Sequence, residues 1–369
     1  MSIKPLDGIR VLDATSNIAG PFGGAVLADL GAEVIKIETP TGDPARSMAP
    51  IDGERSAYFN IVNRNKLVRT IDFKSQEGRA EFDQLLANAD VFLTNFLPDR
   101  LKALDLLPEA LMKQNPQLIF GNLTSYGSKG KDSGIPGYDA TVQARTGIMY
   151  VTGEPEGQPV RAGVSVLDIG AGTWLATGVL AAIIQRTKTG KGSLIETSLF
   201  ETGVSWVSYH LAAFQISGVE SVRSGAGHPT FSPYGIFATK SGEICIGVGS
   251  DAVFAKLCPQ IDRLDLISNP LYAENVGRVA NRNLLHIEIE KALASNTAIY
   301  WAKRLGENSV PADLVVPPEA LLKDPQVKEI GALLPNPDSS SKVKWIPGLP
   351  FTIDGVRPEI YRSAPNVDK

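Results

Sequence analysis

The stretch that decides the fold is residues 9–37, which read IRVLDATSNIAGPFGGAVLADLGAEVIKI. The apolar run Ile9–Leu12 predicts a short buried strand, Gly20–Leu30 a turn that enters a helix, and Glu33–Ile37 a second strand. Two strands joined by a helix form a βαβ unit, whose strands run parallel in one sheet. The sequence therefore predicts an α/β fold.

The same alternation continues to about residue 200, so we expect a Rossmann-like parallel sheet. Helices are predicted at Gln76–Ala87 and from Val164 onward. Further strands are predicted at Val68–Asp72, Val91–Thr94, Leu118–Gly121 and Ser193–Thr197.

A second, smaller α+β domain is predicted after residue 224. There a glycine-rich stretch precedes a probable hairpin, Gly235–Thr239 with Glu243–Val248, and helical patterns then fill Asp251–Leu305. The proline-rich end of the chain is expected to return to the first domain. We therefore predict a large domain from 1–200 and 320–369, a linker at 201–224 and a small domain at 225–319.

Composition excludes several classes of function. The net charge of −4 argues against a nucleic-acid partner, because phosphate binding needs clustered basic side chains. Two cysteines and three histidines, in no ligand spacing, predict neither a disulfide framework nor a metal site. The first residues contain no apolar signal core, and the apolar stretch Val164–Ile184 includes Asp168, which favours a buried helix over a membrane span. We expect a soluble cytoplasmic protein.

The first strand–helix junction has glycines at positions 20, 23 and 24, and Glu38 follows the second strand. These features are typical of dinucleotide sites, but the Gly-x-Gly that lets a pyrophosphate approach the helix is missing. Glycines that serve close packing are therefore favoured over NAD binding.

A polar cluster, Asn63-Arg64-Asn65-Lys66, precedes the strand predicted at Val68. Two cations and two amides at a strand entrance can meet phosphates. Taken alone, such residues more often solvate a loop.

Asp139 follows Gly137-Tyr138 and precedes a helical pattern. An acid after a flexible glycine can be displayed into a cleft as a nucleophile, or it can cap the helix that follows. From these residues alone the cap is favoured.

A set of motifs along the whole chain favours the nucleophile over the helix cap for Asp139, because it resembles the class III CoA-transferase family, also called CaiB/BaiF. The motifs occur in the family's order and span nearly the whole chain. They are 6–13 (LDGIRVLD), 19–21 (AGP), 28–38 (ADLGAEVIKIE), 42–44 (GDP), 63–66 (NRNK), 95–96 (NF), 137–139 (GYD), 190–192 (GKG), 227–229 (GHP) and 233–235 (PYG).

The resemblance implies a CoA-transferase in which Asp139 is the nucleophile. The carboxylate would attack an acyl-CoA to give a mixed anhydride and then an aspartyl-CoA thioester, which an acceptor acid attacks in turn. Gly227 and His228 match a loop over the nucleophile whose N–H groups would steady oxyanions. The family fold implied is a large domain whose sheet is built from both chain ends, with an inserted small domain and an interlocked homodimer.

No permanent cofactor is implied, since CoA is a substrate. Relative to the best-known formyl-CoA member of the family, Ile18 replaces a polar residue, and Thr39 and Ala103 replace arginines and Thr124 a lysine that help hold CoA there. Arg64, Lys102 or Lys36 are the candidates to compensate. The positions matching CoA-binding residues are Ala19, Asn63, Arg64, Lys66, Asn95, Phe96, Tyr126 and Gly127.

Two alternatives remain open: a 2-methylacyl-CoA racemase of the same family, and a non-catalytic CoA- or nucleotide-binding protein. The racemase branch has a histidine where Tyr138 stands, and a tyrosine with its ordinary pKa of about 10 is a poor base. Asp168 matches the second acid of that branch. Residues 223–237 resemble members that act on short dicarboxylic acids such as mesaconate, citramalate or itaconate, with succinyl-CoA as donor, and Arg145 or Arg46 is the candidate to bind the acceptor carboxylate.

Overall fold

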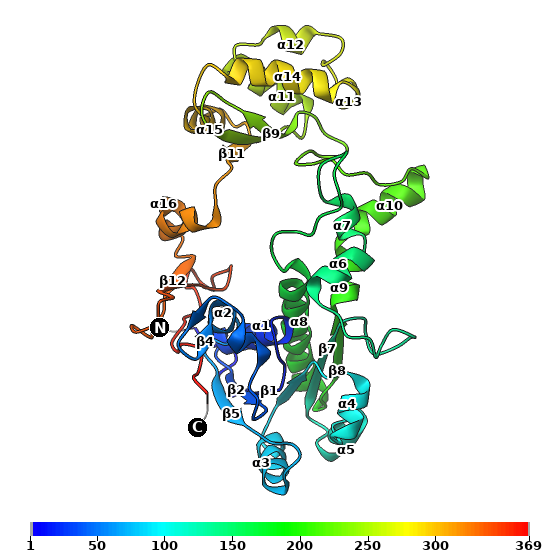
Figure 1. Cartoon of the computed structure of the whole chain (residues 1–369), viewed down its shortest axis with the longest axis vertical. Coiled ribbons are helices and arrows are strands. Elements are labelled where there is room, and N and C mark those ends of the chain that lie inside the picture. Colours follow the sequence, from blue (N-terminus) through cyan, green and yellow to red (C-terminus); the bar gives the residue numbers. More distant parts are fainter. Residues whose placement is uncertain (1–2, 368–369) are drawn as a thin grey trace. The chain divides into compact units, whose positions relative to one another are not determined.

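The computed structural model describes residues 3–367, which form two compact units (Figure 1). The first unit contains the chain up to residue 148, residues 161–217 and the chain from residue 322 onward. The second contains residues 149–160 and 218–321. Relative to the predicted boundaries, residues 149–160 thus go with the second unit and residues 201–217 with the first.

The first unit is built on a six-stranded sheet in which every strand pairs in parallel with its neighbours. Its order, β5-β2-β1-β6-β7-β8, is that of a doubly wound Rossmann-type sheet. The predicted parallel α/β sheet is therefore confirmed. The strands are β1 (Arg10–Asp13), β2 (Glu33–Glu38), β5 (Leu67–Thr70), β6 (Val91–Thr94), β7 (Ile119–Thr124) and β8 (Leu194–Ser198).

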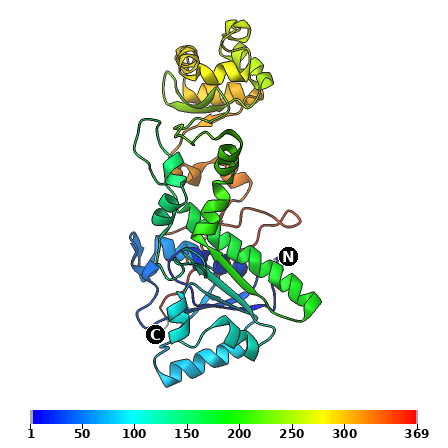
Figure 2. The ribbon, with the colours of Figure 1, turned by 90° about the vertical axis from the view of Figure 1, so that its right-hand side faces the viewer.

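Helices cover both faces of this sheet, which explains why its central strands are almost entirely buried. On one face Phe82, Phe92 and Phe120 pack edge to face. On the other, α1 (Ala19–Asp29) packs closely on α8 (Val166–Thr189), which lies along the sheet in Figure 2. A Cβ on Gly23 would stand 2.8 Å from the carbonyl oxygen of Gly172, so the glycine-rich start of α1 does serve close packing.

The remaining elements of the first unit are short. Two small antiparallel pairs are β3 (Ile51–Asp52) with β4 (Arg55–Ser56) and β12 (Leu333–Pro335) with β13 (Trp345–Pro347). The helices are η1 (Pro44–Ser47), α2 (Ala57–Val62), α3 (Gln76–Ala87), α4 (Pro98–Ala103), α5 (Pro108–Gln114), α6 (Asp139–Arg145), α9 (Leu199–Trp206), α10 (Ser208–Ser217) and α16 (Pro325–Glu329).

The C-terminal segment joins the first unit but, among the described residues, adds no strand to its sheet, contrary to the prediction of a sheet built from both chain ends. Asn65 holds this segment instead. Its side chain accepts the N–H groups of Tyr361 and Arg362 and donates to the carbonyl oxygen of Glu359. Arg46 and Arg55 also donate to the carbonyl oxygens of Pro365 and Ala364, so hydrogen bonds from several residues hold the segment in place of strand pairing.

The second unit has its own antiparallel sheet, in the order β11-β10-β9, and its own core around Trp301. Its strands are β9 (Tyr234–Ala238), β10 (Glu243–Gly247) and β11 (Ala312–Leu314). The helices assigned over its range are α7 (Ile148–Val151), α11 (Asp251–Gln260), α12 (Asp265–Ser268), α13 (Asn275–Ala280), α14 (Arg282–Leu293), α15 (Ala298–Glu307) and η2 (Pro318–Lys323).

One helix, α8, is long and apolar enough to cross a membrane by length and composition alone. Core helices of globular proteins pass the same test. Part of its apolar surface packs against α1, β7 and β8 within the first unit.

Candidate active site

A cleft of about 550 Å³ opens in the first unit beside the carboxyl ends of β1, β6 and β7. In this sheet the order in which the chain adds strands reverses between β1 and β6. Ligands of doubly wound sheets bind at this point because the loops there diverge. The cleft is lined by Ser16, Asn17, Ile18, Ala19, Met48, Asn95, Leu97, Leu123, Thr124, Ser125, Tyr126, Pro136, Gly137, Tyr138, Thr141, Asp168 and Leu199.

Two side chains shape the loop after β1 at the mouth of this cleft. The amide of Asn95 accepts the N–H of Ser16 at 3.1 Å and donates to its carbonyl oxygen at 3.0 Å. Asp43 accepts the N–H of Asn17, a residue whose φ of 66° lies in the left-handed region. These bonds fix the backbone on which Ile18 and Ala19 enter α1.

Asp139 lies beneath the cleft and is only 6% exposed. Its carboxylate accepts the backbone N–H groups of Leu167 at 2.7 Å and of Asp168 at 3.1 Å, and the side-chain amide of Gln143. Asp139 is therefore a helix cap, but it caps the N-terminus of α8 rather than that of the helix it begins. Its oxygens are occupied by three donors.

Asp168 lies in the first turn of α8 and lines the cleft. Among the described residues, no group donates a hydrogen bond to its carboxyl. Burial, and secondly the charge of Asp139, raise the pKa of Asp168 to about 7. The cleft thus presents one unpartnered carboxyl that is about half ionised near neutral pH.

Comparison with known proteins places this geometry in a family. The model of CoA-transferase family III matches residues 6–369. The chain belongs to CoA-transferase family III.

Individual members of the family resemble the chain over nearly its whole length. It is 35% identical to the acetyl-CoA:oxalate CoA-transferase of Acetobacter aceti, covering 99% of this chain and 93% of that protein. It is 36% identical to the human succinyl-CoA:glutarate CoA-transferase, covering 90% and 76%. The crystal structure of a CAIB/BAIF family protein from Brucella suis superposes with a TM-score of 0.88 at 32% identity, covering 99% and 96%. The chain is accordingly a CoA-transferase.

A second depression of about 200 Å³ lies beside the cleft of this CoA-transferase and shares Ser16 with it. Phe96 and Arg100 line it, and the guanidinium carbon of Arg100 lies 3.9 Å from the centre of the Phe96 ring. No described carboxylate pairs with Arg100. Sequence reasoning missed this residue, although it stands one helical turn before Ala103, where the family pattern has an arginine.

The cluster at residues 63–66 has a different role from the predicted contact with CoA. Lys66 is fully buried and donates to Asp13, to the carbonyl oxygen of Pro21 and to Asn63. Arg64 is buried in an ion pair with Asp29. Lys66 and Arg64 therefore hold α1 and β1 in place, and Asn63, whose Oδ1 accepts from Lys66, is buried with its side-chain Nδ2 unpartnered among the described residues.

The other predicted cations are also engaged. Lys36 is buried against Asp43 at 2.7 Å, Arg46 forms two hydrogen bonds to Glu38, and Arg145 pairs with Asp132. Lys102 is exposed on α4 and lines neither the cleft nor the depression. Lys36 lines the depression but is paired with Asp43, so neither it nor Lys102 is poised to replace the missing arginines. Arg46 and Arg145, predicted to bind the acceptor carboxylate, are paired with Glu38 and Asp132.

The remaining predicted residues divide between the two units. Ala19, Asn95 and Tyr126 line the cleft, Phe96 lines the depression, and Gly127 donates its N–H to Thr124 in the turn next to Tyr126. Gly227 and His228 lie in the second unit, where Arg282 donates to the carbonyl oxygen of His228. Their role over the nucleophile stays a prediction.

Metal ligation finds no support in the described part of the chain. Over residues 3–367, no group of three or more His, Cys, Asp or Glu side chains is placed to hold a metal ion.

Proposed function

We propose that this CoA-transferase uses Asp168, rather than the predicted Asp139, as its nucleophile. The observation that supports this assignment is that the Asp168 carboxyl accepts no hydrogen bond from the described residues and lines the cleft. Asp139, by contrast, does not line the cleft, and both its oxygens accept hydrogen bonds. A nucleophile must reach the substrate, and a carboxylate whose pKa is raised is more basic and hence more reactive once ionised.

In the proposed reaction an oxygen of Asp168 attacks the thioester carbon of the donor, and the C–S bond breaks with its electron pair on sulfur. The CoA thiolate then attacks the aspartyl carbonyl of the anhydride, which releases the donor acid and leaves an aspartyl-CoA thioester. An acceptor carboxylate displaces the thiolate from that thioester, and the thiolate attacks the acceptor's carbonyl carbon. The products are the new acyl-CoA and the free Asp168 carboxylate.

The cleft and the neighbouring depression suggest how CoA binds. The thioester end must reach Asp168 in the cleft, so the nucleotide end falls to the adjoining depression. There Arg100 supplies a cation for a phosphate, and its stacking on Phe96 fixes the guanidinium plane. Arg100 thus takes over from the arginines that Thr39 and Ala103 replace.

Short dicarboxylic acids, with succinyl-CoA as donor, are the proposed substrates. Relatives named for succinyl-CoA:glutarate and acetyl-CoA:oxalate transfer support this class, as does the likeness of residues 223–237 to members that act on such acids. No Lys, Arg or His is among the described residues lining the cleft, so the distal carboxylate must be bound by a residue outside that set.

The interlocked homodimer and the cytoplasmic location stay predictions. Large apolar side chains exposed on α8, α9 and α10 are consistent with a second copy covering these helices. They are Trp174, Ile184, Trp206, Leu211, Phe214 and Ile216.

The nucleophile is tested by intact-protein mass after incubation with succinyl-CoA, followed by peptide mapping. We expect a hydroxylamine-labile CoA adduct on Asp168 that Asp168→Asn abolishes, together with at least a ~10³-fold loss of transfer activity. Asp139→Asn keeps the Asp168 carboxyl, so any adduct it forms, even at a lower level, should still map to Asp168. An adduct mapped to Asp139 would restore the first prediction, and deuterium entering the α-carbon without any adduct would indicate a racemase.

A further inference from the structure

Asp139 and Asp168 form a pair of like charges that no described cation balances. The Asp139 carboxylate accepts a hydrogen bond from the backbone N–H of Asp168 at 3.1 Å, so the two residues are in direct contact. All three donors to Asp139 are neutral groups: two backbone N–H groups and the amide of Gln143. None of these donors carries a positive charge that would cancel the charge of Asp139.

Charged groups elsewhere do not relieve this pair. On the elements that pack against α8, Asp29 of α1 is paired with Arg64, Glu201 of α9 is bonded to Ser198, and Arg145 of α6 is paired with Asp132. Glu196 of β8 lies at a separate surface depression, and the other titratable side chains among the described residues lining the cleft are the tyrosines Tyr126 and Tyr138. Asp139 is therefore the charge that acts on Asp168.

The N-terminus of α8 is also divided unequally between the two acids. Unpaired N–H groups at a helix N-terminus normally favour a carboxylate in the first turn. Here Asp139 takes the N–H groups of Leu167 and Asp168, so these donors are unavailable to the Asp168 side chain.

We propose that Asp139 is a positioning residue whose fixed negative charge disfavours the free carboxylate of Asp168 and thereby drives it into its covalent intermediates. This inference rests on the proposed function, in which Asp168 is the nucleophile. As a carboxylate, Asp168 is repelled by Asp139. As an anhydride or a thioester it is uncharged, because its negative charge leaves on the CoA thiolate or the released acid, and the repulsion is relieved.

The raised pKa of Asp168 fits this account, since burial and Asp139 disfavour its charged form against protonation as they do against acylation. The same repulsion acts on both equilibria, because the protonated and the acylated carboxyl are both neutral. Each unit by which Asp139 raises the pKa of Asp168 therefore favours the covalent intermediate about tenfold.

The test is the pH dependence of adduct formation with succinyl-CoA, followed by rapid quenching and mass spectrometry. For the unmodified enzyme we expect the rate to rise with pH through a midpoint near 7. Asp139→Asn should lower this midpoint by about one pH unit or more and reduce the adduct fraction at equilibrium about tenfold. Asp139→Glu, which keeps the charge, should keep the midpoint.

A second variant covers the case in which Asp139→Asn does not fold. Gln143→Leu removes one neutral donor from Asp139 and should raise the midpoint for Asp168, opposite in sign to Asp139→Asn. If a folded Asp139→Asn or Gln143→Leu lowers the rate but leaves the midpoint in place, Asp139 is only a cap and the inference fails. If the unmodified enzyme forms its adduct elsewhere than on Asp168, the proposed function fails with it.

Discussion

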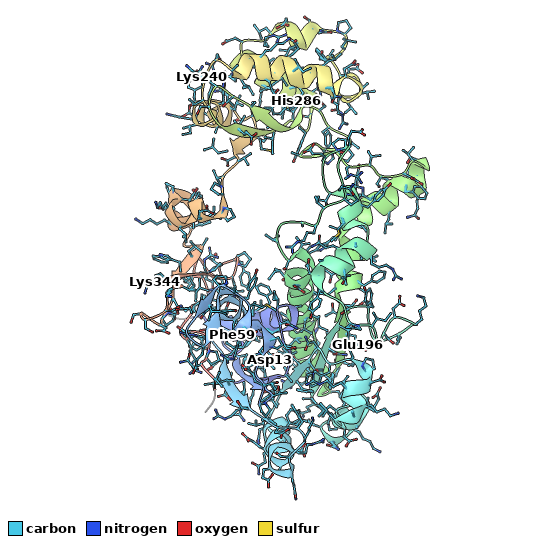
Figure 3. The ribbon with its side chains drawn as sticks, viewed as in Figure 1. Asp13, Phe59, Glu196, Lys240, His286 and Lys344 are labelled. Atoms are coloured by element: carbon cyan, nitrogen blue, oxygen red, sulfur yellow. The ribbon has the colours of Figure 1, made fainter. Side chains whose placement is uncertain are left out.

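Two groups of buried charge in the first unit differ in how they are balanced. Around Asp13, labelled in Figure 3 at the end of β1, every carboxylate has a cation: Lys66 for Asp13, Lys36 for Asp43 and Arg64 for Asp29. At the start of α8, by contrast, Asp139 and Asp168 stand together without one. The first group lies around helix α1 and the second at the start of helix α8, and both are largely buried.

The contrast indicates which buried charges are structural and which are reactive. In the balanced group, burial by itself would raise the pKa of Asp13, yet Lys66 and Lys36 hold this pKa below its usual range. At Asp29 burial still raises the pKa, although the paired Arg64 opposes it. In the unbalanced pair nothing offsets burial, and the pKa of Asp168 rises to about 7. Perturbed groups of the second kind cluster at catalytic sites, because chemistry needs a group that is poorly satisfied at rest.

Breaking the balanced group should have the largest effect on folding. Lys66→Met leaves Asp13 fully buried without the cation that contacts it, and we expect the free energy of unfolding to fall by about 3–5 kcal/mol. Urea unfolding followed by circular dichroism measures this loss. Lys102→Met, at an exposed lysine, is the control and should change stability by about 0.5 kcal/mol or less. If Lys66→Met and Lys102→Met lowered the free energy of unfolding equally, the Lys66–Asp13 pair would not be a stabilising one, and its contrast with the unpaired acids would be lost.

Removing the charge of Asp168 should change the free energy of unfolding in the opposite direction to Lys66→Met. The pKa of Asp168 is raised by burial from the ordinary 3.8 to about 7, so its ionisation destabilises the fold as pH rises through this interval. Asp168→Asn should therefore raise the free energy of unfolding at pH 8 by about 2–4 kcal/mol, while the enzyme loses activity. The gain should disappear below about pH 4, where the aspartate is protonated in both states. A lower free energy of unfolding for Asp168→Asn at pH 8 would contradict the raised pKa of Asp168.

The fold was largely predictable because its signals are local. The βαβ pattern at residues 9–37 and the helix at Gln76–Ala87 follow from short-range periodicity, and the structure has both. The place of the C-terminal segment was harder, since it depends on Asn65 binding residues almost 300 positions away. No periodicity in the sequence marks such a contact.

The site was predicted less well than the fold, and for a physical reason. Asp139 and Asp168 are both isolated acids in sequence, and only their three-dimensional arrangement distinguishes the occupied carboxylate from the free one. At residues 63–66 the sequence suggested a binding site where the structure has internal contacts. Four polar residues suggest a ligand site, but Asp13 and Asp29, which neutralise its cations, lie more than 30 positions away in the chain.

Arg100 gives the smallest expected effect and extends the comparison to a cation without a carboxylate. If it binds a phosphate of CoA, Arg100→Ala should raise KM for succinyl-CoA about tenfold, or ~1.4 kcal/mol, with little change in kcat, because this contact is far from the reacting bond. Steady-state kinetics measures the split, and Lys102→Ala on the same helix is the matched control. With the succinyl thioester of 3′-dephospho-CoA the loss should shrink if the contact is to the 3′-phosphate and persist if it is to the diphosphate. An unchanged KM with both substrates would mean that Arg100 is a surface cation held by Phe96, and that an unbalanced charge marks the site only where it is also buried.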